Sequence, residues 1–159
     1  MDEKGSGSVS RAARTSKQRN VLRYRRPAEV TPRARVVIAD DNSACLDHIG
    51  RLLEMRFEIV ARAADGVECV AAARRLSPSV VVTDISMPRM NGIEATRLIA
   101  KHCPGVKVVV LSVHDDPAFI EAALEAGASG YVLKLQAFDD LVPAIEKLLE
   151  RPSFEVVTK

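Results

Sequence analysis

Residues 79–99 read SVVVTDISMPRMNGIEATRLI and contain the pattern that decides the fold. Three consecutive valines, residues 80–82, form a short β-branched run typical of a strand covered on both faces. Asp84 follows this run almost directly. The residues of one helix face then recur at three-residue spacing: Ile93, Thr96 and Ile99. The stretch therefore predicts a buried strand, a loop and an amphipathic helix, in that order.

The same unit recurs on both sides of this stretch. Further apolar runs occupy residues 36–39, 57–60, 106–111 and 131–133, with helix-length amphipathic segments between them. Five β/α units within residues 35–150 predict an α/β fold, with an open, doubly wound, five-stranded parallel sheet and helices on both faces. Asp116 and Pro117 indicate the start of one helix and Gly127 its end. The last helix is expected to start near Asp139, which places Pro143 at the end of its first turn.

Composition and charge separate this domain from the N-terminal segment. The chain has 159 residues, of which 47% are hydrophobic and 28% are charged, with a formal net charge of +2. Residues 1–35 hold ten Lys/Arg and only three Asp/Glu. We therefore expect a basic, disordered arm over residues 1–34, one domain over 35–150 and a C-terminal tail over 151–159.

Hydropathy and cysteine usage bear on the compartment. No apolar run reaches the roughly 20 residues that span a bilayer, so no membrane association is expected. Three widely spaced cysteines, without metal-ligand spacing, are typical of reduced thiols in a cytoplasmic protein. We therefore predict a cytoplasmic location.

Polar residues follow the apolar runs, where the carboxyl ends of parallel strands meet at one edge of a sheet. An Asp pair, a serine or a lysine after a strand is most often a cap, a turn residue or a surface charge. Together, three carboxylates would repel one another unless a cation lay among them, and oxygen ligands suit Mg²⁺. A hydroxyl and an ammonium can then hold a phosphate from the other side. These residues predict a site that receives a phosphoryl group: Asp40, Asp41, Asp84, Ser112 and Lys134.

Four sequence blocks carry a resemblance to a known family. Residues 84–95 (DISMPRMNGIEA) resemble the phosphoacceptor segment of the receiver domains of bacterial two-component response regulators. Residues 36–42, 111–116 and 127–134 resemble the other receiver blocks and occur in the same order. Their sequences are similar to those of the NarL-type subfamily. The resemblance covers residues 35–150 and implies the flavodoxin-like receiver fold with strand order 2-1-3-4-5.

The resemblance also implies a role for individual residues. Asp84 would be phosphorylated, with Ser112 and Lys134 contacting the phosphoryl group. Mg²⁺ would be held by Asp84, Asp41, Asp40 and the backbone carbonyl of Ser86. Ser112 and Tyr131 would form the conformational switch, although a half-buried strand aromatic remains an alternative for Tyr131. Ser86 and His114 would tune the lifetime of the phosphorylated state.

The resemblance further implies partners and an output. The phosphoryl donor would be a sensor histidine kinase or a phosphotransfer protein, and the output a downstream protein partner, with a phosphorylation-dependent homodimer as one option. Such a domain is a signalling module and not an enzyme, beyond catalysing its own phosphorylation and slow autodephosphorylation.

Two departures from the family pattern leave alternatives open. Leu135 follows Lys134 where many receivers have a proline after a cis peptide, so the loop is either strained or trans. NarL-type regulators usually continue into a helix-turn-helix domain, which nine residues after the last helix cannot form, so DNA binding is not expected from this chain alone. The alternatives are a stand-alone receiver, a transcription regulator whose output domain was lost or removed, and a nucleic-acid- or anion-binding protein acting through its basic arm.

Overall fold

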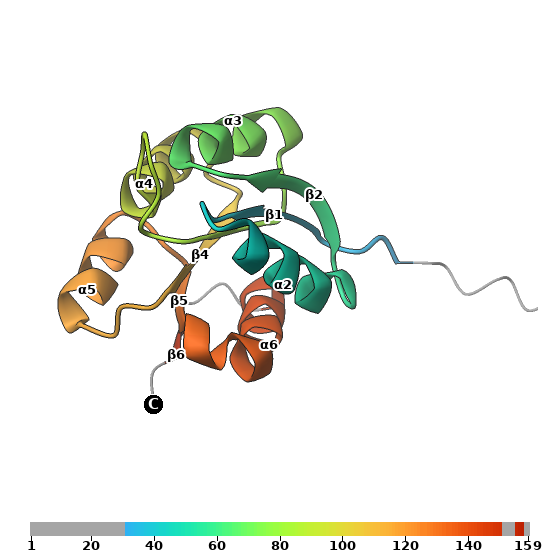
Figure 1. The fold of residues 1–159 in the computed structure, drawn as a ribbon. Helices are drawn as coiled ribbons and strands as arrows, with labels where there is room; N and C mark the ends of the chain where they lie inside the picture. Colours follow the sequence, from blue (N-terminus) through green and yellow to red (C-terminus); the bar gives the residue numbers. More distant parts are fainter. Residues whose placement is uncertain (1–30, 151–154, 158–159) are drawn as a thin grey trace, which may run out of the picture. The chain divides into compact units, whose positions relative to one another are not determined.

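A computed structural model of the chain describes residues 31–150 and 155–157 (Figure 1). Its centre is a parallel sheet in the order β2-β1-β3-β4-β5-β6. The strands are β1 (Arg35–Ala39), β2 (Glu58–Ala63), β3 (Val80–Thr83), β4 (Lys107–Ser112), β5 (Gly130–Leu133) and β6 (Glu155–Val157). The predicted order 2-1-3-4-5 is confirmed.

The helices connect these strands. They are α2 (Ser43–Glu54), α3 (Gly66–Leu76), α4 (Gly92–His102), α5 (Pro117–Glu125), the short 3₁₀ turn η2 (Lys134–Gln136) and α6 (Ala137–Glu150). Side chains cap four of them by accepting a hydrogen bond from a first-turn backbone N–H. The capping residues are Asn42, Asp65, Asn91 and Asp116.

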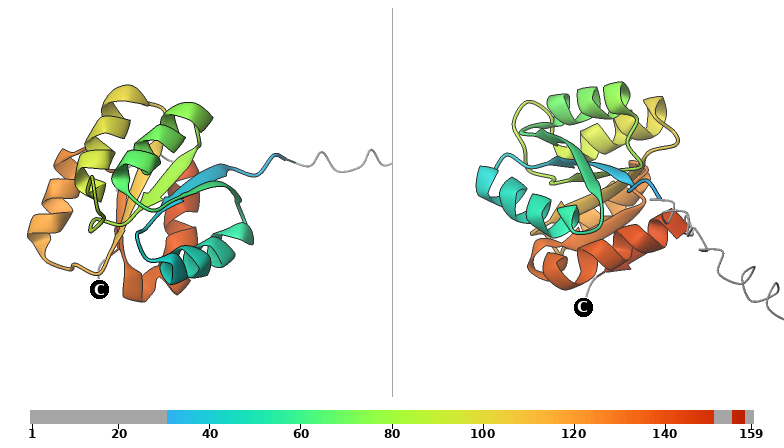
Figure 2. Two further views of the ribbon diagram at one scale, coloured as in Figure 1. Left: turned by 45° about the horizontal axis from the view of Figure 1, so that its top comes forward. Right: turned by 90° about the vertical axis from the view of Figure 1, so that its right-hand side faces the viewer.

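Alternating residues of the central strands face two different helical layers. Val36 and Ile38 of β1 belong to the core shared with α2 and α6, whereas Val37 and Ala39 belong to the core shared with α3 and α4. A third core, centred on Tyr131, lies beneath α5. Figure 2 shows α3 and α4 on one side of the sheet and α2 and α6 on the other. Because both faces are covered, the strands read as continuous apolar runs.

The C-terminal end of the chain differs from expectation. Residues 155–157 form a sixth strand, paired in parallel with β5, within the segment predicted to be a tail. Three residues are too short for periodicity to distinguish a strand from irregular structure, so the sequence did not indicate β6. Residues 151–154 and 158–159 lie outside the described residues, as do residues 1–30 of the predicted basic arm.

Three local predictions can be compared with the structure. Helix α5 begins at Pro117, with Asp116 as its cap, and Gly127 follows its end with φ 99°, as expected. The prediction for Pro143 was wrong, because α6 begins at Ala137 and places the proline beyond the first turn. Pro143 is exposed, so water can bond the carbonyl that lacks its N–H partner.

The peptide bond after Lys134 can be compared with the two alternatives left by the sequence. No cis peptide bond occurs in the described chain, so the Lys134–Leu135 bond is trans, one of the two predicted alternatives. None of the helices in the described ranges is long and apolar enough to cross a membrane.

Candidate functional site

The polar residues predicted to form the site lie at the carboxyl ends of the strands. Asp40 and Asp41 follow β1, Asp84 follows β3, Ser112 ends β4 and Lys134 follows β5. The neighbouring strands β1 and β3 bring the acids together, because Asp84 N extends the ladder by donating to Ala39 O at 2.9 Å. Asp41 and Asp84, which are 43 positions apart in the chain, thus become neighbours.

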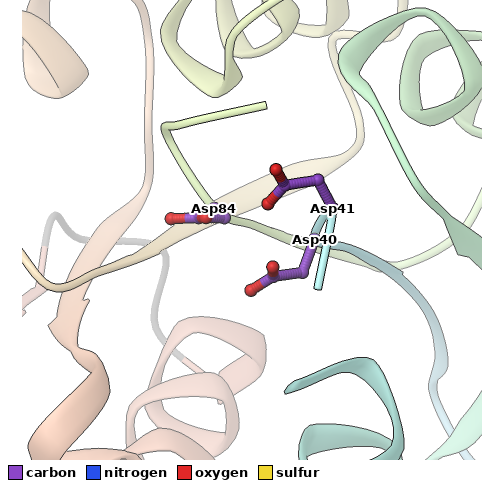
Figure 3. Close-up of side chains that lie close together, drawn as sticks. All are labelled: Asp40, Asp41 and Asp84. Carbon is purple, nitrogen blue, oxygen red and sulfur yellow. The ribbon is translucent and has the colours of Figure 1, made fainter. Parts of the chain in front are cut away.

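Three carboxylates converge at this edge of the sheet. One oxygen from each of Asp40, Asp41 and Asp84 lies within 4.8 Å of the others, and Figure 3 shows all three carboxylates pointing to the same side. Asp40 and Asp84 are buried, whereas Asp41 is exposed. Backbone N–H groups orient the two buried carboxylates: Asn42 N donates to Asp40 Oδ1 at 2.9 Å and Ile85 N to Asp84 Oδ1 at 2.8 Å.

Lys134 supplies the positive charge of the site. Its Nζ lies 2.6 Å from Asp40 Oδ2 and 3.2 Å from Asp84 Oδ2. Nζ also lies 3.9 Å from Cys45 Sγ, on the first turn of α2. The ammonium therefore points at the carboxylates, as the sequence predicted.

Burial and the neighbouring charges shift the pKa values of the site residues in opposite directions. Burial raises the pKa of Asp84; the Lys134 charge works against this rise, while the Asp40 charge adds to it. Burial by itself would lower the pKa of Lys134, but its hydrogen bond to Asp40 and the charges of both carboxylates outweigh burial and raise it. One ammonium thus pairs with two carboxylates, Asp40 and Asp84, while the third carboxylate of the cluster, Asp41, lies nearby.

This arrangement fits a divalent cation. Three carboxylate oxygens in close reach, one of them exposed to solvent, match the hard oxygen ligands and retained waters that Mg²⁺ prefers. The repulsion between Asp40 and Asp84 that one lysine leaves uncompensated is the physical reason for a cation here.

Ser112, His114 and Tyr131 form a second group beside the acids. Ser112 is buried, and its Oγ accepts a hydrogen bond from His114 N at 3.1 Å. The buried Tyr131 donates its hydroxyl hydrogen to His114 O at 2.7 Å. These contacts tie the end of β4 and the loop after it to β5.

The two predicted tuning residues lie differently. Ser86 is exposed in the loop after Asp84. The half-buried ring of His114 stacks on Phe119 of α5, with 4.2 Å between centroids and 14° between planes. Its ring is therefore held against α5.

Two glycines of the site have a role that sequence reasoning missed. A Cβ on Gly92 would lie 1.8 Å from Asp84 O, and a Cβ on Gly66 would lie 2.3 Å from Met90 O. Only glycine permits these close approaches of backbone to backbone. The sequence signal was present in the Asn91–Gly92 and Asp65–Gly66 pairs, but nothing in it identified their neighbours.

Comparison with known proteins assigns the family. Residues 36–146 match the family model of the response regulator receiver domain. The chain belongs to this family: it is a receiver domain of two-component response regulators. Receiver domains are signalling domains, and binding of Mg²⁺ at an acidic pocket and phosphorylation are typical of them.

Relatives at the level of sequence include proteins named as transcriptional regulatory proteins and as response regulators. The chain is 42% identical over 113 residues to the transcriptional regulatory protein DegU of Brevibacillus brevis, covering 70% of this chain and 48% of that protein. It is 34% identical over 116 residues to the response regulator GacA of Pseudomonas aeruginosa, covering 72% and 54%. The chain thus spans about half the length of the curated relatives it matches.

Solved structures agree with the fold. A LuxR-family two-component response regulator from Aurantimonas sp. SI85-9A1 superposes with a TM-score of 0.73 at 37% identity, covering 77% of this chain and 89% of that one. The isolated receiver domain of RcsB from Salmonella enterica serovar Typhimurium, determined with phosphomimetic BeF₃⁻, gives 0.71 at 30% identity, covering 77% and 93%. The predicted family and its NarL/LuxR kinship are confirmed.

Proposed function

We propose that Asp84 accepts a phosphoryl group from a phosphohistidine of a sensor histidine kinase or a phosphotransfer protein. Mg²⁺ would be held by Asp40, Asp41, Asp84 and the backbone carbonyl of Ser86. The observation that carries the proposal is the approach of Lys134 Nζ to 3.2 Å from Asp84 Oδ2, beside a cluster of three carboxylates.

The chemistry follows from these positions. An oxygen of Asp84 forms a bond to phosphorus while the phosphorus–nitrogen bond breaks, and the bonding electron pair stays with the imidazole nitrogen of the donor. Lys134 turns from the carboxylates to the phosphoryl oxygens, whose charge it offsets, so catalysis is positioning and electrostatics. Bound Mg²⁺ would supply further neutralisation of those oxygens.

The contacts of Ser112 support a switch that follows phosphorylation. Its buried hydroxyl bonds the new phosphoryl group, and the loop at His114, which is bonded to both Ser112 and Tyr131, responds. Ser86 and His114 border the path of a hydrolytic water and set the lifetime of the phosphoryl-aspartate. The changed surface is the output.

The family points to a histidine kinase as the phosphoryl donor and to a protein partner as the output. The domain, over residues 35–150, acts in the cytoplasm on a downstream protein, or as a phosphorylation-dependent homodimer, and catalyses only its own phosphorylation and slow dephosphorylation.

Intact mass spectrometry with a small phosphodonor tests the proposal. With acetyl phosphate and Mg²⁺, the full chain should gain one phosphoryl group, and Asp84→Asn should not. Asp115→Asn, which changes an exposed aspartate outside the cluster, serves as the matched control and should still gain one. An unchanged mass of the wild-type chain would reject Asp84 as an acceptor.

A further inference from the structure

The loop between Asp84 and α4 is held by a contact that the proposed chemistry does not use. Arg89 Nε donates to Asp65 Oδ2 at 2.8 Å, joining this loop to the turn between β2 and α3. Directly beside it, Gly66 N donates to Met90 O at 3.1 Å. One side-chain contact and one backbone contact thus hold the same part of the loop.

The backbone of Arg89 adopts a conformation that is unfavourable for an arginine. Arg89 has φ 64°, in the left-handed region. A residue with a Cβ is strained in that conformation, which glycine adopts freely. The ion pair with Asp65 is a contact that glycine could not make, and it favours arginine at this position despite the strain.

Asp65 is a rigid partner for this arginine. Its carboxylate is buried, and while Oδ2 accepts from Arg89, Oδ1 accepts from Glu68 N at 2.9 Å as the cap of α3. The hydrogen bond from Arg89 holds the pKa of Asp65 below its usual range, so the carboxylate is charged at neutral pH. Both oxygens are therefore fixed by neighbouring structure.

The segment held in this way contains Ser86. At the N-terminal end of this segment, Ile85 O accepts a hydrogen bond from Gly92 N at 2.8 Å. Asp84 N donates to Ala39 O, which anchors Asp84 to the sheet. Between these ends lies the exposed Ser86, and the Arg89–Asp65 ion pair is the side-chain contact that anchors this part of the loop, beside the backbone contact at Met90. We infer that the Asp65–Arg89 pair is a positioning pair, which orients the loop bearing the Ser86 carbonyl and thereby sets the affinity of the site for Mg²⁺.

This inference rests on the proposed function, because it assumes a Mg²⁺ site that includes Ser86. A positioning role can be distinguished from a simple charge effect by whether each of two substitutions strengthens or weakens Mg²⁺ binding. Removing the positive charge of Arg89 would strengthen cation binding if only long-range electrostatics mattered, whereas removing the negative charge of Asp65 would weaken it. A positioning role predicts weaker binding in both cases.

The experiment is a Mg²⁺ titration of the unphosphorylated full chain, followed by NMR amide shifts and by calorimetry. The variants are Arg89→Gln, Arg89→Lys, Asp65→Asn and the double variant Asp65→Asn/Arg89→Gln; asparagine caps a helix as well as aspartate does. Glu54→Gln is the matched control, because it removes one partner of another ion pair, Arg62–Glu54 at 2.9 Å, at the far end of α2.

Each single variant, Arg89→Gln and Asp65→Asn, should raise the Mg²⁺ dissociation constant about tenfold, the low end of the range for residues that orient metal ligands. The double variant should be no worse than either, Arg89→Lys should recover part of the loss, and Glu54→Gln should match the wild type. A dissociation constant for Arg89→Gln equal to or below that of the wild type overturns the inference, even if the variant unfolds more easily. Failure of the wild-type chain to bind Mg²⁺ would instead reject the proposed function.

Discussion

Lys134 Nζ lies 3.2 Å from Asp84 Oδ2, although β4 separates the strands that precede the two residues. The lysine also contacts Asp40 at 2.6 Å, so its ammonium bridges acids from two other strands. Lys134 is thus the counter-charge of two buried carboxylates, and in the proposed reaction it would donate to the incoming phosphoryl group.

Replacing Lys134 by methionine should slow phosphorylation by acetyl phosphate about a hundredfold, because a preorganised donor is lost. The free energy of unfolding should also fall by about 2 kcal/mol, since the side chain of Lys134 is 18% exposed and its loss leaves two buried carboxylates without a counter-charge. Lys147→Met, which removes an exposed lysine on α6, controls for charge and should change neither quantity. Equal rates for the two variants would contradict the role of Lys134.

Stability of the metal-free chain should depend on the charge of Asp84. The folded state raises the pKa of Asp84, chiefly by burial, so its ionised form is less favourable in the folded than in the unfolded chain. Below the unfolded-state pKa, Asp84 is protonated in both states and does not change the stability. The destabilisation grows as the pH rises from the unfolded-state pKa towards the folded-state pKa, and it is complete above the latter. Asp84→Asn should therefore gain stability relative to the wild type as the pH rises above the ordinary aspartate pKa of 3.8. Urea unfolding with a chelator present measures this difference, and a difference that shrinks as pH rises would count against the prediction.

Mg²⁺ should stabilise the folded chain through the carboxylate cluster. At a Mg²⁺ concentration of about 100 times the dissociation constant, the free energy of unfolding should rise by about 2.7 kcal/mol, because only the folded state assembles the ligands. Asp41→Asn should remove most of this gain, which a thermal melt can record. Asp47→Asn, an exposed acid of α2 outside the cluster, should keep it. A full Mg²⁺ response in Asp41→Asn would exclude Asp41 from the site.

Gly92→Ala should destabilise the chain by about 3 kcal/mol or more, because its Cβ would lie 1.8 Å from Asp84 O. The clash also displaces the backbone of Asp84, so the proposed phosphorylation should slow. Gly105→Ala is the matched control, since no atom of the described residues lies within 4 Å of its added Cβ. Chemical unfolding of both variants checks the prediction, which fails if they lose similar stability.

Local patterns predicted most of the fold because they report burial directly. The run of Val80 to Val82 and the spacing of Ile93 and Ile99 reflect which faces of a strand and a helix contact the core. The prediction for Pro143 was wrong. The 3₁₀ turn after Lys134 leads directly into α6, so the helix begins earlier than any capping signal in the sequence indicated. Strand β6 was missed because its three residues depend on pairing with β5.

The residue types and their order along the chain were enough to predict a parallel α/β domain with acids, a hydroxyl and an amine at one edge. Those properties are local, since burial imprints periodicity on sequence and the carboxyl ends of parallel strands share an edge. The distances among Asp40, Asp84 and Lys134, the tight approach at Gly92 and the pairing of Arg89 with Asp65 came only from the tertiary structure. They depend on how strands and loops distant in the chain pack together, and no spacing within the sequence encodes a contact between two such loops.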